Sequence, residues 1–371
     1  MPDKLIASLR DWADIESFTH DVAGVNRMAD AVAAYVAGAP VSIERIAGRE
    51  GLGDIIILKA GPATAAKPVL LLSHVDTVHP PGTKSGPLAI RVDGDRLYGP
   101  GVYDMKGGAL LALEAFKAAA LRRSLVAPTV FIFTPDEEIG SPTSRRLVED
   151  YGRKAAAALV TEPARDGGKI VTARKGVGIV DVMITGTPAH AGVKHERGRS
   201  AIREAARQIL AIEAMTDYAR GITTNVGVIS GGSARNVVPQ TCRFEVDFRA
   251  IDRAGATEVE AALCKLETHD PDTTIAVSGG LNRPPFPPND ATMKLFAIAR
   301  AIAARDDWAL DHVPLTGGGS DGNFTADVGC PTLDGLGVDG DGAHTLQEYA
   351  LISSLLPRQK LIEGLLESNL A

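Results

Sequence analysis

Histidines and acidic residues follow several apolar runs of this sequence, at the points where each run becomes polar. His74 and Asp76 end the run KPVLLLSHVD, Glu137 and Glu138 come just after PTVFIFT, and Glu162 follows AAAALVT. In an open α/β sheet the carboxyl ends of the strands lie along one crevice, so groups far apart in the sequence can meet there. Imidazoles and carboxylates together suit zinc better than calcium or magnesium, which prefer all-oxygen sites.

Two further candidates lie in glycine-containing segments. Asp104 stands in YGPGVYDMKGG and His344 in GDGAHTLQEY. A turn or an exposed loop would explain either residue alone. Together with His74, Glu162 and the adjacent acids Asp136, Glu137 and Glu138, whose mutual repulsion a cation would relieve, they form a set of imidazoles and carboxylates that is too large for one tetrahedral zinc with an open position. The set favours two metal ions about 3.5–4 Å apart that share a bridging carboxylate.

The elements that must position these groups alternate along the chain. Short apolar runs are separated by helix-forming stretches such as GGALLALEAFKAAALRR. This alternation of strand-like and helix-like segments predicts a sheet with helices on both faces. From residue 174 the pattern becomes strand, helix, two strands, helix, strand, which is the ferredoxin-like order. We therefore expect a discontinuous catalytic domain, residues 1–173 and 284–371, and an inserted α+β domain, residues 174–283.

Composition narrows the classes of function. The chain has 371 residues, of which 45% are hydrophobic and 23% charged, with a formal net charge of −7 and no basic block. These values fit a globular protein and argue against a nucleic-acid partner. No run of apolar residues is long enough to span a membrane, and the charged N-terminal stretch does not resemble a secretory signal. Cys242, Cys264 and Cys330 are far apart and lack a CxxC pattern, so we expect reduced cysteines and a cytoplasmic location.

The order of the motifs carries a family resemblance. SHVDTV, YGPGVYDMKGG, TPDEEIGS, VTEP, GTPAHAG, GGGSDGNF and AHT occur in this sequence. They resemble, in the same order, the di-zinc aminoacylase, acetylornithine deacetylase and glutamate carboxypeptidase family, over most of the chain. ARNVVP and LNRPPF make the sequence most similar to the glutamate carboxypeptidase branch. The resemblance implies a zinc-peptidase-like domain with helices on both faces of a mixed sheet, and an inserted ferredoxin-like dimerisation, or lid, domain.

The resemblance also implies roles for single residues. Two zinc ions, or cobalt or manganese in their place, would be held by His74, Asp104, Glu138, Glu162 and His344. His74 and Glu162 would bind one ion, Glu138 and His344 the other, and Asp104 both. Asp76 would orient His74, and the bond between Asp104 and Met105 would be cis.

The implied chemistry is hydrolysis of an amide in a small N-acyl amino acid or short peptide. Glu137 would be the general base that activates water and protonates the leaving amine. His190, in the inserted domain, would stabilise the oxyanion in the partner subunit of a homodimer. Arg283 and Asn236 would bind the free carboxylate of the substrate, and backbone N–H groups at Gly318 and Gly319 could assist.

Three functions remain open at this point. The first is removal of a C-terminal, glutamate-like amino acid from an N-acyl or peptide substrate. The second is a deacylase of the acetylornithine deacetylase or succinyl-diaminopimelate desuccinylase type. The third is a metal-binding module without turnover, which the presence of Glu137 beside the ligand Glu138 disfavours, because a pure binding site needs no spare base.

Overall fold

The computed structural model describes residues 2–370, so residues 1 and 371, at the ends of the expected catalytic domain, lie outside the described residues. The chain forms two compact units. Unit 1 comprises residues 1–173, 288–316 and 320–371, and unit 2 comprises residues 174–287 and 317–319. Unit 2 is therefore one long insertion into unit 1, residues 174–287, together with the short glycine segment at residues 317–319.

Unit 1 is built on a mixed sheet of six strands in the order β1-β2-β6-β3-β7-β14. Its strands are β1 (Ser42–Ile46), β2 (Ile55–Ala60), β3 (Val69–His74), β6 (Thr129–Thr134), β7 (Ala157–Val160) and β14 (Thr332–Leu333). Strands β6, β3, β7 and β14 are parallel neighbours, whereas β1 and β2 pair antiparallel. The carboxyl ends of β6, β3 and β7 therefore lie side by side, as the positions of the polar residues predicted.

The sheet is covered on both faces because its strands are apolar at successive positions. In β3, Val69 and Leu71 belong to one hydrophobic cluster, and Leu70 and Leu72 to another. Helices on the first face are α1 (Pro2–Asp14), α2 (Val22–Tyr35), α3 (Lys106–Arg122), α7 (Asp290–Ala303) and α9 (Ile352–Leu366). Helices α4 (Arg145–Gly152) and α8 (Gly322–Asp327) cover the second face. The expected α/β class, with helices on both faces of a mixed sheet, is confirmed.

Short strands complete unit 1. A sheet in the order β15-β16-β5-β4 joins segments from the two ends of the chain. Its strands are β4 (Arg91–Asp93), β5 (Arg96–Tyr98), β15 (Gly340–Asp341) and β16 (Tyr349–Leu351). A separate parallel pair consists of β8 (Ile170–Val171) and β13 (His312–Val313). Within residues 2–370, no helix combines the length and the apolar character needed to cross a bilayer.

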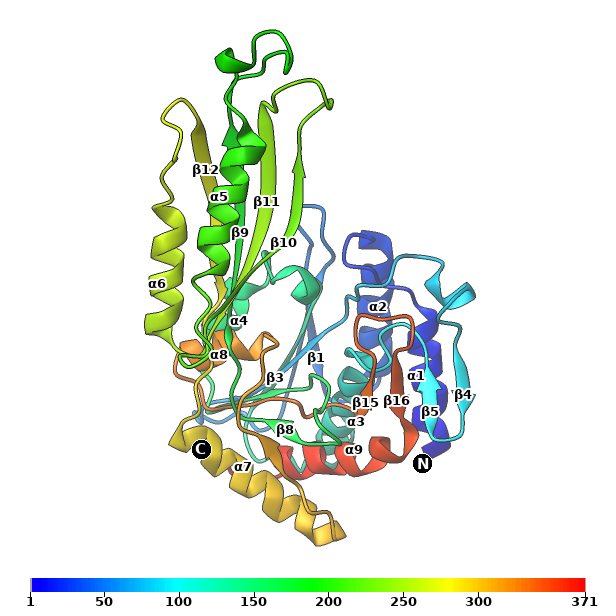
Figure 1. Cartoon of the computed structure of the whole chain (residues 1–371). Helices are drawn as coiled ribbons and strands as arrows, with labels where there is room; N and C mark the ends of the chain where they lie inside the picture. The colour runs from blue at the N-terminus through cyan, green and yellow to red at the C-terminus, as the bar shows by residue number, and fades with distance from the viewer. Residues whose placement is uncertain (1, 371) are drawn as a thin grey trace. The chain divides into compact units, whose positions relative to one another are not determined.

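Unit 2 is a four-stranded antiparallel sheet in the order β10-β11-β9-β12, with two helices on one face (Figure 1). Along the chain these are β9 (Gly176–Thr185), α5 (Ala201–Glu213), β10 (Thr223–Gly231), β11 (Thr241–Ala250), α6 (Arg253–Cys264) and β12 (Thr274–Arg283). In β9, Val180, Val182 and Ile184 face the helices, whereas Ile179 and Met183 are exposed. Both the element order and the strand order are ferredoxin-like.

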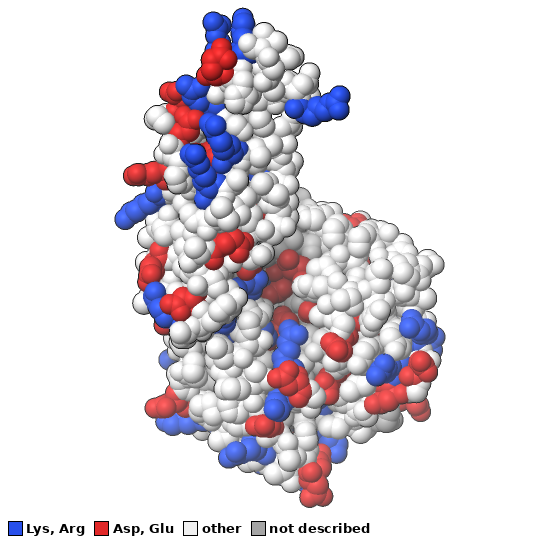
Figure 2. Space-filling model, viewed as in Figure 1, with Lys and Arg blue, Asp and Glu red and all other residues white. Residues whose placement is uncertain are grey.

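Basic side chains of unit 2 have acidic neighbours. Arg199 lies 2.7 Å from Asp272, and Arg203 lies 3.4 Å from Asp270. In Figure 2, red side chains are interspersed among the blue ones on the visible face. Exposed pairs of this kind contribute only about 0–1 kcal/mol each.

A buried carboxylate anchors one loop of unit 2. Glu204 on α5 accepts hydrogen bonds from the backbone nitrogens of His269 and Asp270, at 3.0 and 3.3 Å. It also contacts His269 Nδ1 at 3.0 Å and accepts a hydrogen bond from Gln208 Nε2 at 2.8 Å. Burial opposes the charge, but the hydrogen bonds from His269 and Gln208 lower the pKa of Glu204 below its ordinary value.

We expect the substitution Glu204→Gln to lower the free energy of unfolding by about 1–3 kcal/mol near neutral pH, because it removes a charged acceptor. The folded pKa lies below the unfolded value of about 4.5, so the contribution is complete above that value and is lost as the pH falls through the folded pKa. Urea unfolding of both proteins at several pH values measures the difference. A difference that stays constant from neutral to acidic pH would contradict this role.

Candidate metal centre

Three predicted ligands follow parallel strands of the unit 1 sheet. His74 is the last residue of β3, Glu138 lies in a single turn after β6, and Glu162 follows β7. Because β6, β3 and β7 are neighbours, their carboxyl ends bring these side chains together. His74 is 1% exposed and Glu162 4% exposed, and the side chain of Glu138 is 4% exposed. Such groups need partners, since buried charges without them are costly.

Asp104 and His344 come from the two loops next to the small sheet. Asp104 lies between β5 and α3, and His344 lies between β15 and β16. Residue Tyr98 of β5 pairs with Tyr349 of β16, so the two loops start from adjacent strands. The bond between Asp104 and Met105 is cis, as the resemblance predicts.

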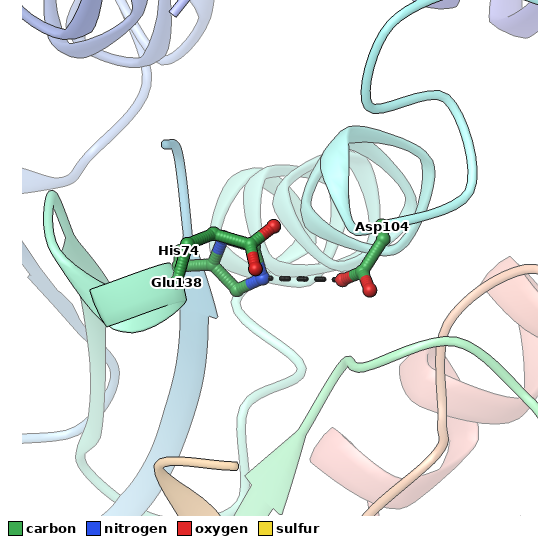
Figure 3. A group of neighbouring side chains, drawn as sticks. All are labelled: His74, Asp104 and Glu138. Carbon is green, nitrogen blue, oxygen red and sulfur yellow. Dashed lines mark hydrogen bonds and ion pairs between the residues drawn. The ribbon is translucent and has the colours of Figure 1, made fainter. Parts of the chain in front are cut away.

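The two oxygens of Asp104 face different imidazoles. Oδ1 lies 3.3 Å from Nε2 of His74, and Oδ2 lies 3.5 Å from Nε2 of His344. Figure 3 shows His74 and Asp104 pointing toward one another, with Glu138 beside His74. The structure therefore places one carboxylate between the two histidines.

Each imidazole has a second carboxylate of its own. Glu162 Oε1 lies 3.7 Å from Nε2 of His74, and Glu138 Oε2 lies 3.0 Å from Nε2 of His344. Candidate ligand atoms of His74, Asp104 and Glu138 lie within 4.8 Å of one another, as do those of His74, Glu137 and Glu162. These two groups share His74, whereas by ion-pair distance Glu162 lies near His74, Glu138 lies near His344, and Asp104 contacts both imidazoles.

Several groups of the site have pKa values shifted from their ordinary range. Burial disfavours the charged form of His74, but hydrogen bonds to Asp104 and Asp76 outweigh it and hold the pKa of this imidazole well above its usual value. Hydrogen bonds to Asp104 and Glu138 raise the pKa of His344 to about 11. Burial and the charge of Asp104 raise the pKa of Glu138. A cation bound at these groups would compete with protons for them.

One buried atom lacks a protein partner. Oε1 of Glu138 is buried and makes no hydrogen bond, although its companion Oε2 contacts His344. A buried carboxylate oxygen without a partner is unusual in folded proteins. The donor set of imidazoles and carboxylates, together with this oxygen, fits a divalent transition metal.

Asp76 holds the ligand segments together as well as contacting His74. The ring Nδ1 of His74 lies 3.0 Å from the backbone oxygen of Asp76 and 3.4 Å from its Oδ1. The carboxylate of Asp76 also accepts hydrogen bonds from the backbone nitrogens of Glu137 and Glu138, each at 3.2 Å, and from Thr19 Oγ1 at 2.8 Å. The resemblance implies that Asp76 orients His74, but it gives no indication of the contacts with Glu137, Glu138 and Thr19.

Asp136 does not join its acidic neighbours. The sequence suggests that three adjacent acids surround a cation, but the carboxylate of Asp136 accepts hydrogen bonds from Thr143 and Ser144. These hydroxyl and N–H donors satisfy its charge away from the cluster. Glu137, by contrast, is half-buried beside His74 and Glu162.

The remaining predicted residues all lie in unit 2. His190 and Asn236 are exposed on adjacent backbone segments, where the nitrogen of Ala191 donates to the oxygen of Asn236 at 2.9 Å. Arg283, at the end of β12, is 4% exposed. A Cβ on Gly319 would lie 2.6 Å from Cδ of Arg283, so only glycine allows this approach.

No pattern in the sequence marks Arg174, which is fully buried and holds the glycine segment. Its Nη1 donates to the oxygen of Gly318 at 3.0 Å. A lone arginine beside a lysine, in TARKG, has the appearance of a surface residue.

Comparison with known proteins identifies the family. Residues 70–368 match the model of peptidase family M20/M25/M40. Carboxypeptidase G2 of Pseudomonas sp. (strain RS-16) is 30% identical over 364 residues, covering 96% of this chain and 86% of the relative. Acetylornithine deacetylase of Myxococcus xanthus is 34% identical over 209 residues, covering 53% of each chain.

A solved structure supports the fold. The M20 family metallo-carboxypeptidase Sso-CP2 of Sulfolobus solfataricus superimposes with a TM-score of 0.76, at 17% identity, over 98% of each chain. The family match covers most of this chain, including every residue of the candidate centre. The chain therefore belongs to peptidase family M20/M25/M40 and is a hydrolytic enzyme.

Proposed function

We propose that this enzyme is a two-metal hydrolase that cleaves the amide bond before a C-terminal amino acid in an N-acyl or peptidyl substrate. The observation that carries the proposal is the position of Asp104, with one oxygen toward His74 and the other toward His344. The carboxypeptidase G2 relative, similar over 96% of this chain, supports the substrate class.

Zinc is the metal that the donor set favours, with cobalt or manganese as substitutes. His74, Glu162 and Asp104 would hold one ion, and His344, Glu138 and Asp104 the other. When bound, the metals would acidify water and polarise the amide carbonyl.

The protein's own residues would then move the proton. Glu137 is half-buried, and its backbone nitrogen is fixed by Asp76, so its carboxylate is held beside the cluster. Glu137 accepts a proton from the attacking water and delivers it to the leaving nitrogen. Asp76 keeps the Nδ1 side of His74 occupied, so that Nε2 faces the cluster.

Unit 2 would supply the groups that recognise the substrate. Arg283 and Asn236 bind the free carboxylate, with help from the backbone at Gly318 and Gly319. A guanidinium suits this task because its planar fork binds both carboxylate oxygens.

We expect Arg283→Met to raise KM by about 10–100-fold with a much smaller change in kcat, because an ionic contact made equally in ground and transition states is lost. Steady-state kinetics measure the effect. Arg243→Met, an exposed arginine that pairs with Asp181 on the same sheet, is the control. An unchanged KM in Arg283→Met would exclude a carboxylate contact at this residue.

We also propose a homodimer formed through unit 2. Exposed apolar side chains lie on α5 and on the edge strand β10, among them Leu210 at 74%, Val228 at 53% and Ile229 at 54% exposed. An apolar surface of this kind is typical of an interface. His190 of one subunit would stabilise the oxyanion in the other.

Mixing two inactive variants tests this arrangement. Glu137→Gln and His190→Gln subunits should each be nearly inactive, and their heterodimer should regain one working site, because one subunit supplies Glu137 and the other His190. The measurement is activity after joint unfolding and refolding of the two variants. If the mixture stays as inactive as its components while a heterodimer forms, His190 does not act across the interface.

The alternative reaction is deacylation of a small N-acyl amino acid, which the acetylornithine deacetylase relative favours. Hydrolysis of a panel of N-acyl amino acids and dipeptides, with and without added zinc, tests the proposal. Zinc-dependent release of a C-terminal glutamate-like residue is expected. Preference for acetylornithine or succinyl-diaminopimelate would establish the alternative, and zinc-independent turnover would contradict both.

The cytoplasmic location is also part of this proposal, supported by three free cysteines, Cys242, Cys264 and Cys330.

A further inference from the structure

A buried pair, His79 and Glu348, lies in unit 1 beside the candidate metal centre. Nε2 of His79 lies 2.6 Å from Oε2 of Glu348. The side chains are 6% and 1% exposed. Neither residue belongs to the ligand set or contacts the ligand side chains by any hydrogen bond described above. A buried histidine–carboxylate pair that takes no part in the reaction calls for a structural explanation.

The carboxylate of Glu348 binds the backbone of the Asp104 loop. Oε1 accepts hydrogen bonds from the backbone nitrogens of Tyr103 and Asp104, each at 2.9 Å, and Oε2 accepts one from Gly101 at 3.1 Å. With His79, these donors give the carboxylate four contacts. Hydrogen bonds to a charged acceptor are stronger than neutral ones.

The Tyr103 hydroxyl donates to the oxygen of Ala164 at 2.6 Å, but three backbone nitrogens of this loop depend on Glu348. Between the end of β5 at Tyr98 and the start of α3 at Lys106, the backbone turns through Gly101, whose φ is +75°. Buried backbone nitrogens must find acceptors, and the nitrogens of Gly101, Tyr103 and Asp104 find theirs in Glu348. The position of Asp104 therefore depends on a side chain from the other end of the sequence.

The pair lies where the ligand segments meet. Glu348 directly precedes β16 and lies on the same hairpin as His344. His79 lies on the segment that follows His74 and Asp76 at the end of β3. One carboxylate thus connects the segments that carry His74, Asp104 and His344.

We propose that Glu348 is a positioning residue for the metal centre, which holds Asp104 between the two histidines, and that His79 fixes the Glu348 carboxylate in this orientation. The inference rests on the proposed metal centre for its functional meaning, but its structural part can be tested without metal.

The first test measures amide hydrogen exchange in the metal-free protein. Glu348→Gln replaces one carboxylate oxygen by an NH2 group, which cannot accept, so at least one side of the carboxylate loses its backbone partners. Exchange within residues 99–105 should accelerate by at least about tenfold, since it reports local opening.

Glu204→Gln is the matched control, because Glu204 is a buried carboxylate of unit 2 that also binds two backbone nitrogens and a histidine ring. It should accelerate exchange around residues 269–270 and leave residues 99–105 unchanged. Unchanged amide exchange at residues 99–105 in Glu348→Gln would overturn the inference, regardless of the Zn²⁺ affinity of the variant.

The second test measures Zn²⁺ affinity by competition with a chromophoric chelator. Residues that orient ligands typically change metal affinity by about 10–100-fold. We expect a loss of this size in Glu348→Gln, a fall in kcat with little change in KM, and wild-type affinity in Glu204→Gln. If the wild-type protein binds two Zn²⁺ and Glu348→Gln binds them equally well, the positioning role is wrong. If the wild-type protein binds no Zn²⁺, the proposed centre fails and the functional part of this inference with it.

Substitutions of His79 keep the inference testable even if Glu348→Gln does not fold. His79→Gln retains an N–H donor toward Glu348, whereas His79→Phe fills similar space without one. We expect near wild-type Zn²⁺ affinity in the first and a reduced affinity in the second. Equal affinities in the two variants would overturn the role of the His79 hydrogen bond.

Discussion

Replacing Glu137 by glutamine is expected to lower kcat by about 10³-fold while both metal ions stay bound. The substitution keeps the size of the side chain and removes its ability to accept a proton from water. Glu137 follows β6 in the same turn as the proposed ligand Glu138, and its backbone nitrogen donates to Asp76, so the change should not disturb the cluster. Steady-state kinetics and metal analysis of the same sample measure both quantities.

Glu149→Gln, on α4 of the same unit, is a suitable control, because this glutamate pairs with Arg145 and is not part of the cluster. Its kcat should be unchanged. Activity close to wild type in Glu137→Gln would refute the general-base role. Loss of one metal would show that Glu137 is a ligand, which its grouping with His74 and Glu162 would explain.

Replacing Asp104 by alanine is expected to have the largest effect on metal content. Asp104 presents one oxygen to each imidazole, so its loss removes a ligand from both proposed ions. We expect the affinity for both ions to fall by at least about 100-fold. Equilibrium dialysis at fixed free Zn²⁺, followed by metal analysis, measures the stoichiometry.

His344→Ala provides the matched comparison, because it should weaken only the ion that Glu138 also holds. The bridging role therefore predicts loss of both ions in Asp104→Ala and of one in His344→Ala. If Asp104→Ala retained one ion at wild-type affinity, Asp104 would belong to a single site.

The main features of the centre could be predicted because they depend on local patterns. His74, Glu138 and Glu162 each follow an apolar strand, and parallel neighbouring strands end at one edge of a sheet. The ferredoxin-like order of unit 2 was visible for the same reason, since β9 and β11 alternate clearly between buried and exposed residues. Asp104 and His344 are assigned their ligand roles from the family resemblance, because neither lies at the end of a periodic apolar segment.

Other features depend on contacts between distant segments, which a single sequence does not reveal. Glu348 and Asp104 are 244 positions apart, and the strands β5 and β16 that bring them together are too short to show a pattern. Gly107 and Gly108 lie inside α3, and the sequence alone does not show why glycines stand there. A Cβ on Gly108 would lie 2.0 Å from the oxygen of Thr161, so close packing requires glycine there.

The most direct test of the two-metal proposal is a crystal structure of the zinc-loaded protein with anomalous diffraction data at the zinc edge. We predict two peaks about 3.5–4 Å apart, with an oxygen of Asp104 at each, His74 and Glu162 at one, and Glu138 and His344 at the other. A single peak, or two peaks that do not both contact Asp104, would contradict it.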